Sequence, residues 1–540
     1  MSNGITQLPE SSSRLKVGIW VEGELGDKYI ADLLTSLNVS GLFDLTLVVA
    51  KPQISVQNWL YRTIWRFIHR EEQKYLEGHA LHSDHTSSRT LSKQVPSIVL
   101  LNSKEEDLLM VREQDFDLVV VCGQVAPSRE MLAGIRLGAV ALTGIDGDLA
   151  GASMGFWECY YAQPKSGFAI VAWETDAAPQ VLQHGYYSTR AQYLLNQAEL
   201  RYKCNAHYKD LLQGIALNGQ LPQPQPVMLA PRQRALGLGA GLGFAARIVS
   251  RKIVQKVHKK YLLGMEEWGV SFMYAPWDER PLPRLITPKV PAGHFWADPF
   301  LLEHEGRTYC FLEDYDYARG LGHVSVLELR GDDCVDLGPC LVEPFHLSFP
   351  YLFHYQGQLY LCPEASESDQ IRVYVCAEFP LRWELAAVLM QNVSAADTML
   401  FEAHGRWWLL TNIDQARGGD HCSELQLFYS DSPLSTDWTP HPMNPLRIDS
   451  DGGRNGGLIL DQGRLLRLGQ RQGFDHYGEG LLVYEIVEIS ETVYVERLVS
   501  RLDPVELGRS AIHHLSTTGR VTAIDHKQWY YLNKAPSRVE

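Results

Sequence analysis

The sequence predicts a multidomain protein in which an α/β domain is followed by an all-β five-bladed propeller. The chain has 540 residues, more than one ordinary core encloses, so two to four domains are expected. Apolar strands alternate with helix-like segments between residues 15 and 202, as in domains built on a parallel or mixed sheet. After Trp268 only strands are predicted, and they recur in a repeat of about 50 residues, the pattern of propeller blades.

The amino-acid composition of the chain argues against some classes of function. The chain is 45% hydrophobic and 21% charged, which is ordinary for a globular protein, and its net charge of −15 argues against a general nucleic-acid binder. The nine cysteines form no CxxC pair and are odd in number, so we expect reduced thiols and a cytoplasmic protein. The N-terminus lacks a signal-peptide layout, and no apolar run reaches about 18 residues, so no membrane span is expected.

The first domain is predicted from apolar runs and helical spacing. Strands are expected where β-branched residues cluster, at residues 15–22, 43–50 and 116–123. Helices are expected at residues 27–41, 59–77 and 128–138, the first ending at Gly41. The polar segment 79–93 is predicted to be a loop.

A linker and a basic helix separate the two domains. Residues 218–233 are rich in proline, which is typical of a linker. Residues 237–264 combine basic residues with apolar residues at helical spacing. They form either a surface helix for anionic lipid, with peripheral membrane contact through residues 245–262, or a connector helix packed between domains. We favour the connector because packing also needs the apolar face. The domains are therefore placed at residues 15–205, 206–265 and 266–535.

The glycines within residues 237–243 have a second interpretation. "GLGAGLG" has the composition of a phosphate-binding loop. No strand precedes it, and no lysine followed by serine or threonine closes it, so this is weak evidence for phosphate binding.

Four hairpins define the repeat of the second domain. Their turn glycines are Gly306, Gly357, Gly405 and Gly463, spaced 51, 48 and 58 residues apart. Each follows one polar or charged residue, as in a two-residue turn that needs positive φ at the glycine. A fifth blade is expected near residues 511–525, closed by strands from both chain ends.

The repeat predicts where polar strand ends meet. Counting from a turn centred just before each glycine, the residue eight positions earlier faces the residue seven positions later. The four predicted pairs are Asp298 with Glu313, Phe349 with Glu364, Asp397 with Asn412, and Asn455 with Gln470. Seven of these eight residues are acids or amides, a restriction that ordinary polar strand ends do not require. We therefore favour a site at one mouth of a central channel.

The residue types at this mouth suit sugar chemistry. Closely held carboxylates raise one another's pKa, so one stays a general acid while another ionises, and glycoside chemistry uses such a pair. Arg454 would supply a positive anchor. Aromatic rings near these positions could stack on sugar faces, although each ring taken singly is read as packing: Trp296, Tyr351, Trp407, His476 and Tyr477.

Residues 266–530 also resemble a known family. "WADPFLLEHEG", "HLSFPYLFHYQGQLYLCPEAS", "SAADTMLFEAHGRWWLLTN" and "GGRNGGLI" resemble the N-terminal propeller of plant glucosamine inositolphosphorylceramide transferases and their bacterial relatives. More distantly, the module is similar to five-bladed glycosidases of the arabinanase and invertase kind.

This resemblance implies roles for individual residues. Asp298 takes the base position of those glycosidases, Glu364 is the candidate acid and Asp397 the auxiliary carboxylate, with Glu313 added to the catalytic set. Phe349 stands where a second-blade Asp would be, which departs from the glycosidase pattern and makes hydrolysis doubtful. His513 and His514 resemble a closing-blade motif that reaches the channel. The expected substrate-binding residues are Asn412, Arg454, Asn455, Gln470, Trp296 and His514.

Residues 15–200 resemble the formyltransferase fold, a Rossmann-like fold that bacterial relatives fuse to this propeller. The resemblance runs through "FDLVVVCGQVAPSREMLAGIRLGAVALTGIDGDLAGASMGFWECY". It places Ala141 and Thr143 where the family has its catalytic Asn and His, keeps Asp146, and aligns Asp176 with the late catalytic Asp. No nearby side chain replaces the missing base, so the resemblance implies a domain that has lost formyl transfer and acts as a scaffold or docking site. Thr143, Asp146 and Asp176 would form its residual site.

Three functions follow. The first is a carbohydrate-directed propeller, either a glycosyl-handling enzyme or a sugar-binding module, acting in glycoconjugate or secondary-metabolite biosynthesis without a cofactor. The second is formyl or acyl transfer to an amino sugar or amine, which would need 10-formyltetrahydrofolate. The third is a non-enzymatic scaffold. A less favoured variant of the first has Ca²⁺ held by Asp298, Asp397 and Asn412, since their oxygen atoms suit this ion.

Overall fold

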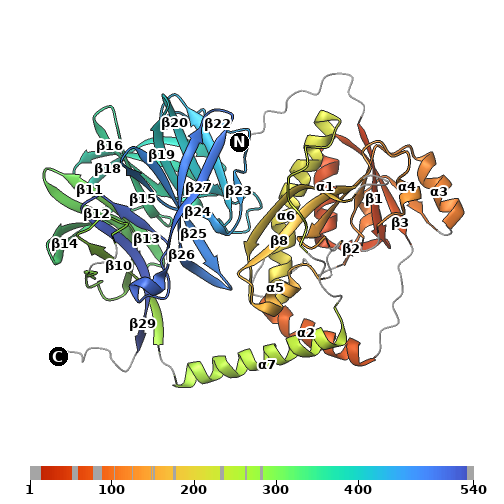
Figure 1. The fold of residues 1–540 in the computed structure, drawn as a ribbon, viewed down its shortest axis with the longest axis horizontal. Helices are drawn as coiled ribbons and strands as arrows, with labels where there is room; N and C mark the ends of the chain where they lie inside the picture. Colours follow the sequence, from red (N-terminus) through yellow and green to blue (C-terminus); the bar gives the residue numbers. More distant parts are fainter. Residues whose placement is uncertain are drawn as a thin grey trace. The chain divides into compact units, whose positions relative to one another are not determined.

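The computed structural model describes the chain as two compact units, one ending at Gln255 and the other beginning at Lys256 (Figure 1). The residues described are 14–50, 59–76, 88–101, 104–123, 126–147, 149, 153–173, 178–230, 236–261, 264–279 and 284–531. None of the described helices is long and apolar enough to cross a membrane. All nine cysteines are free thiols, as their scatter along the sequence predicts.

A mixed seven-stranded sheet forms the centre of the first unit, in the order β5-β3-β1-β6-β7-β8-β9. The first five strands in this order pair in parallel, and β7, β8 and β9 pair antiparallel. The strands are β1 Leu15–Glu22, β3 Phe43–Ala50, β5 Ser97–Leu100, β6 Leu118–Val121, β7 Ala139–Gly144, β8 Lys165–Trp173 and β9 Gln180–Ser188. The predicted α/β architecture with a parallel or mixed sheet is confirmed.

Helices pack on this sheet, and two local predictions need correction. The helices are α1 Lys28–Ser40, α2 Trp59–Leu76, α3 Lys104–Glu113, α4 Arg129–Leu132, α5 Phe156–Tyr161, α6 Tyr193–Asn218 and α7 Leu238–Tyr261. The helix expected at residues 128–138 stops after Leu132, because Gly134 and Gly138 have φ of 95° and 64°, outside the right-handed helical region.

The predicted loop at residues 79–93 is wrong where it is described. Strand β4, Ser88–Thr90, pairs with β2, Leu25–Asp27, and a short 3₁₀ turn follows at Leu91–Lys93. Leu91 is fully buried, which explains why this polar stretch is held in regular structure. Residues 79–87 of the predicted loop lie outside the described part of the chain.

Helices α6 and α7 extend the first unit beyond the expected boundary. The boundary placed at residue 205 falls inside α6, which continues to Asn218 and ends where Gly219 takes φ of 68°. On α7, Phe244 and Ile248 pack against Trp65 of α2. A Cβ on Gly243 would lie 2.4 Å from the Tyr160 hydroxyl oxygen, so this glycine gives close helix packing instead of a phosphate-binding loop.

The second unit is a five-bladed propeller. Four blades are formed in chain order by β11–β14, β15–β18, β19–β23 and β24–β27, and the fifth combines β10 with β28 and β29. The inner strands β11, β15, β19, β24 and β28 contact one another in this order, and β28 contacts β11, so the ring closes. The predicted architecture, including a last blade built from both ends of this unit, is confirmed.

The blades have the following strands. They are β10 Gly264–Met273, β11 His294–His304, β12 Arg307–Asp316, β13 Leu321–Arg330, β14 Asp333–Leu341, β15 Ser348–Tyr355, β16 Gln358–Glu364, β17 Gln370–Glu378, β18 Arg382–Gln391, β19 Ala395–Ala403, β20 Arg406–Ile413, β21 Glu424–Ser430, β22 Thr439–Pro440, β23 Arg447–Ile448, β24 Asp451–Asp461, β25 Arg464–Gly473, β26 His476–Ile489, β27 Tyr494–Leu502, β28 Leu515–Thr517 and β29 Thr522–Tyr531.

The hairpin turns are as predicted, but the strand register is not. All four turn glycines, and the residue before each, have positive φ, for example 76° at Gly306 and 49° at Glu305. Glu313, however, pairs with Ala297 and not with Asp298, because a bulge interrupts β11 between Ala297 and Phe300. Equivalent bulges shift the partners of Glu364 and Asn412 by one residue, and in the fourth blade Asn455 pairs with Gly469 instead of Gln470. A pairing count from the turn misses an extra residue in one strand.

The bulge places one residue of each affected blade in a strained conformation. Asp298, Phe349 and Asp397, at equivalent positions of three blades, have φ of 48°, 45° and 49°. Side chains rarely adopt this region because Cβ crowds the backbone there. The bulge therefore sets the direction of these three side chains independently of the strand ladder.

Candidate functional site

Ionisable side chains from all five blades, together with the amide of Gln470, meet around the inner strands of the propeller. Asp298 and Glu313 come from the first blade, Glu364 from the second, Asp397 from the third, and Arg454 with Gln470 from the fourth. The fifth blade contributes His513, just before β28, and Asp525 on β29. The acids that the repeat predicts near one another thus lie in one cluster, and their role as a site stays a prediction.

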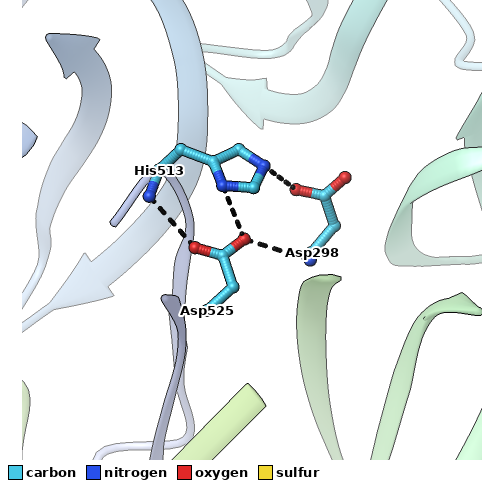
Figure 2. Close-up of side chains that lie close together, drawn as sticks. All are labelled: Asp298, His513 and Asp525. Atoms are coloured by element: carbon cyan, nitrogen blue, oxygen red, sulfur yellow. Dashed lines mark hydrogen bonds and ion pairs between the residues drawn. The ribbon is translucent and has the colours of Figure 1, made fainter. Parts of the chain in front are cut away.

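The deepest part of the cluster is an Asp–His–Asp arrangement (Figure 2). His513 Nε2 lies 3.2 Å from Asp298 Oδ1, and His513 Nδ1 lies 3.0 Å from Asp525 Oδ2. The backbone N–H groups of His513 and His514 donate to Asp525 Oδ1, and that of Asp298 donates to Asp525 Oδ2. The Phe349 N–H of the next blade donates to Asp298 Oδ2 at 3.1 Å. These bonds tie the closing blade to the first two.

Charge pairing fixes the protonation of this group. Burial opposes the charged form of His513, yet Asp525 and Asp298 together raise its pKa to about 10. Burial also acts to raise the pKa of Asp298, but the positive charge and hydrogen bond of His513 outweigh it and lower this pKa to about 2. At neutral pH the structure therefore holds an imidazolium between two carboxylates.

Arg454 organises the opposite side of the cluster. Its Nε donates to Asp397 Oδ2 at 2.6 Å and its Nη2 to Asp397 Oδ1 at 3.1 Å. The same Nη2 donates to Glu364 Oε2 at 3.2 Å, so one guanidinium links three blades. Gln470 Nε2 donates to Asp397 Oδ2 at 3.1 Å. The guanidinium also lies 5.5 Å from the ring centre of Tyr477, within the range of a cation–π contact.

Two carboxyls have a raised pKa. Burial and then the negative charge of Asp298 raise the pKa of Glu313 well above its usual range, which favours the protonated form of this carboxyl. Burial also raises the pKa of Asp397, which Arg454 opposes and Glu364 reinforces. Glu313 lies close to His346, with 3.4 Å between Oε1 and Nε2. The cluster thus combines a carboxyl with a raised pKa, Glu313, and one with a lowered pKa, Asp298.

The inner residues of the cluster are deeply buried. A few partly exposed side chains form its solvent-facing side, which we call its opening. Asp397 and His513 are 1% and 5% exposed. The side chains of Arg454 and His346 are 15% and 25% exposed. A ligand at this opening would meet these two groups and the partly exposed Tyr477 and Glu364 before the inner Asp–His–Asp group.

Several residues expected to bind substrate have other contacts. Trp296 is 2% exposed and lies in an apolar cluster with Val270 and Leu312. Asn412 and Asn455 are fully buried. Asn412 donates to the Glu424 and Gly453 carbonyls, and Asn455 donates to the Asp397 carbonyl. These two amides join the third and fourth blades, and the structure assigns them to packing between blades.

His514 and the aromatic residues considered above also divide into buried and site-facing groups. His514 is fully buried, with its ring centre 4.4 Å from that of Phe300. Tyr351 is buried and donates its hydroxyl to the Leu400 carbonyl, and Trp407 is buried in an apolar cluster. Tyr477 differs from these buried rings, because it lies 5.5 Å from the Arg454 guanidinium.

The residues do not fit the calcium site considered from the sequence. Asn412 Oδ1 accepts the Asn455 N–H at 2.8 Å, and both Asp397 oxygens accept from Arg454. The group Asp298, His513 and Asp525 is compact enough to suggest a metal site. Each imidazole nitrogen of His513 faces a carboxylate oxygen, however, at 3.2 and 3.0 Å, so in this arrangement His513 is paired with both acids.

Sequence reasoning missed Asp525 and assigned no role to His513 beyond proximity to the channel. The signal was weak, because Asp525 ends the apolar run "VTAID" without belonging to a repeated hairpin. The fifth blade takes strands from both ends of the unit, so the four-hairpin repeat does not extend to it.

The residual site predicted in the first unit is partly described. Ala141 and Thr143 are buried on β7, and the Thr143 hydroxyl lies 2.8 Å from the Gly144 carbonyl oxygen. Asp146 lies in the turn after β7. Burial and then the charge of Asp146 raise the pKa of Glu158 to about 7. Asp176 lies outside the described residues.

Comparison with known proteins places the propeller among sequence relatives. Residues 286–517 match the family model described as glucosamine inositolphosphorylceramide transferase 1, N-terminal. The Arabidopsis thaliana protein of that name is 35% identical over 209 residues, covering 38% of this chain and 27% of the relative. The Oryza sativa subsp. japonica protein of that name is 33% identical over 234 residues, covering 41% and 31%. The chain therefore spans less than a third of the length of these relatives.

Solved structures give weaker likenesses. A family 117 glycoside hydrolase from Zobellia galactanivorans has 11% identity and a TM-score of 0.33, covering 50% of this chain and 93% of that one. The catalytic domain of a Coprinopsis cinerea GH62 α-L-arabinofuranosidase has 11% identity and a TM-score of 0.34, covering 48% and 97%. At these TM-scores the likenesses say nothing about chemistry. By sequence, the propeller of this chain is related to the N-terminal region of the glucosamine inositolphosphorylceramide transferases.

Proposed function

We propose that the propeller binds a sugar or glycoconjugate at the opening of its central cluster and acts on it by acid–base chemistry. One observation carries this proposal: two carboxyls of the same buried cluster have pKa values shifted in opposite directions, upward at Glu313 and downward at Asp298. Such a pair supplies both a proton donor and a proton acceptor at one pH. Arg454 and Glu364, at the opening, would orient hydroxyl groups.

The relatives support the choice of substrate class. Their names describe transferases whose substrates carry a sugar and an inositol phosphate lipid. The matched region is only the N-terminal part of those proteins, so the proposal for this chain is limited to recognition of a sugar-bearing molecule by the propeller. A role in assembling glycoconjugates or secondary metabolites would follow from that recognition.

For the first unit we propose a domain of formyltransferase descent without catalysis. Ala141 and Thr143 stand at the positions of the family's amide and base, and neither side chain abstracts a proton at neutral pH. The Thr143 hydroxyl already lies within hydrogen-bond distance of a backbone carbonyl. We therefore propose that the first unit acts as a scaffold or a docking domain.

Two substitutions test the propeller site. Asp298→Asn and Glu364→Gln each keep the side-chain shape and remove one carboxylate. We expect loss of sugar binding, or a fall in turnover of about 10²-fold or more if the groups transfer protons. Glu384→Gln, at a 63% exposed side chain on β18, is the matched control and should behave as the wild type.

Measurement should begin with binding. Calorimetry or thermal shift against free sugars, amino sugars and nucleotide sugars identifies the ligand, and circular dichroism checks that each variant is folded. If folded Asp298→Asn and Glu364→Gln proteins both bind and turn over the ligand like the wild type, the proposed site is wrong. A partner protein recovered with the propeller would then favour the scaffold function.

A further inference from the structure

Helix α7 has an exposed apolar face that its packing in the first unit does not use. Gly241, Phe244 and Ile248 are buried against α2 and α5. A different set, Leu242, Ala246, Val249 and Ile253, recurs at helical spacing and is exposed. Leu242 is 51% exposed, Val249 47% and Ile253 58%. The connector hypothesis explains the buried face of α7 and leaves this second face unexplained.

The surroundings of this apolar face are cationic. The sequence of α7 contains no Asp or Glu. Helix α2 lies along α7, because a Cβ on Gly241 would contact Trp65 and because Lys252 pairs with Glu71 (Figure 1). The exposed residues of α2 include four cations four positions apart, at Arg62, Arg66, Arg70 and Lys74.

The acids of this helix pair are withdrawn from the surface. Glu71 and Glu72 are 5% and 1% exposed. Glu71 is paired with Arg70, Lys74 and Lys252. The described part of the two helices thus exposes cations and buries its acids, on a chain whose net charge is −15.

We infer that α7, assisted by the cations of α2, docks the protein on a bilayer surface that contains anionic phospholipid. Aliphatic side chains flanked by Lys and Arg suit the boundary between headgroups and acyl chains, because the long cationic stems reach the phosphates while the apolar groups leave water. An acidic protein surface would satisfy the cations but would leave Leu242, Val249 and Ile253 exposed. This inference is independent of the proposed sugar site.

Vesicle co-sedimentation of the full chain tests the inference. We expect binding to vesicles of phosphatidylcholine mixed with phosphatidylserine, little binding to phosphatidylcholine alone, and weaker binding at high salt. Arg62→Gln/Arg66→Gln should lower the partition coefficient by roughly fivefold per removed charge. Val249→Ser/Ile253→Ser should also lower it several-fold, because these side chains would no longer gain from leaving water.

The control variant is Arg112→Gln/Leu217→Ser. It removes one exposed cation from α3 and one 66% exposed leucine from α6, and its binding should match that of the wild type. No binding to the mixed vesicles at low salt would overturn the inference. Vesicle binding unaffected by Val249→Ser/Ile253→Ser, together with equal binding to poly-glutamate beads, would also overturn it and would indicate an acidic protein partner.

Discussion

Asp525 holds the deepest part of the site together. It is fully buried, accepts three backbone N–H groups and faces the imidazolium of His513. We expect Asp525→Asn to destabilise the propeller by about 3 kcal/mol or more, because it leaves a buried charge with one partner fewer. Urea unfolding measures this loss. Asp332→Asn, at a 75% exposed side chain, should stay within about 0.5 kcal/mol of the wild type, and equal losses in the two variants would contradict this role.

The raised pKa of His513 also predicts how stability depends on pH. A histidine whose pKa is higher in the folded state than in the unfolded state stabilises the fold fully below the unfolded value. For His513 that contribution is complete below pH 6.5 and is lost as the pH rises toward about 10. The charge-dependent part of the stability difference between wild type and His513→Gln should therefore shrink over this range. Thermal unfolding at several pH values checks this, and a difference that grows with pH would rule it out.

At the scale of single elements, two glycines of α7 allow the effect of close packing on stability to be measured separately from the effect of helix propensity. Gly243 lies inside the helix and Gly239 in its first turn, and alanine is intrinsically better than glycine by up to roughly 1 kcal/mol in a helix. A Cβ at Gly239 meets nothing within 4 Å, whereas one at Gly243 would lie 2.4 Å from the Tyr160 hydroxyl oxygen. We expect Gly239→Ala to stabilise the first unit and Gly243→Ala to destabilise it by about 1–3 kcal/mol. Equal effects in denaturant unfolding would show that α7 does not pack as closely as described.

The sequence predicted repeated elements well and irregular ones poorly. Four hairpins were recognisable because each turn requires a glycine with positive φ, and that requirement is written in the sequence. The bulges at Asp298 and Asp397 were not, because an extra residue in one strand leaves no fixed residue type behind. The axial meeting of the acids was still predictable from the repeat, since the bulge stands at the same position of three blades and keeps these positions equivalent. The partner of Asp298 was not, because Asp525 lies in the blade that breaks the repeat.

At the scale of the whole unit, the propeller depends on a closing pair of strands. Strand β10 pairs with β29 along its full length, from Gly264 with Tyr531 to Met273 with Thr522. This antiparallel pair holds the two ends of the unit together through the hydrogen bonds between the two strands. Deleting residues 522–540 removes β29 and should abolish cooperative unfolding of the propeller in near-ultraviolet circular dichroism. Deleting residues 532–540 is the control and should leave the transition in place. Cooperative unfolding without β29 would mean that the ring closes by other contacts.

The bulge that recurs in three blades has a consequence for amino-acid substitutions at this position. At this position the first and third blades carry an acid, Asp298 and Asp397, and the second carries Phe349, with nearly the same φ in all three. The backbone at this position therefore accepts an acidic or an aromatic side chain with nearly the same conformation. We therefore expect that a single exchange at one of these three positions changes the charge of the cluster and leaves the backbone of the blade as it is.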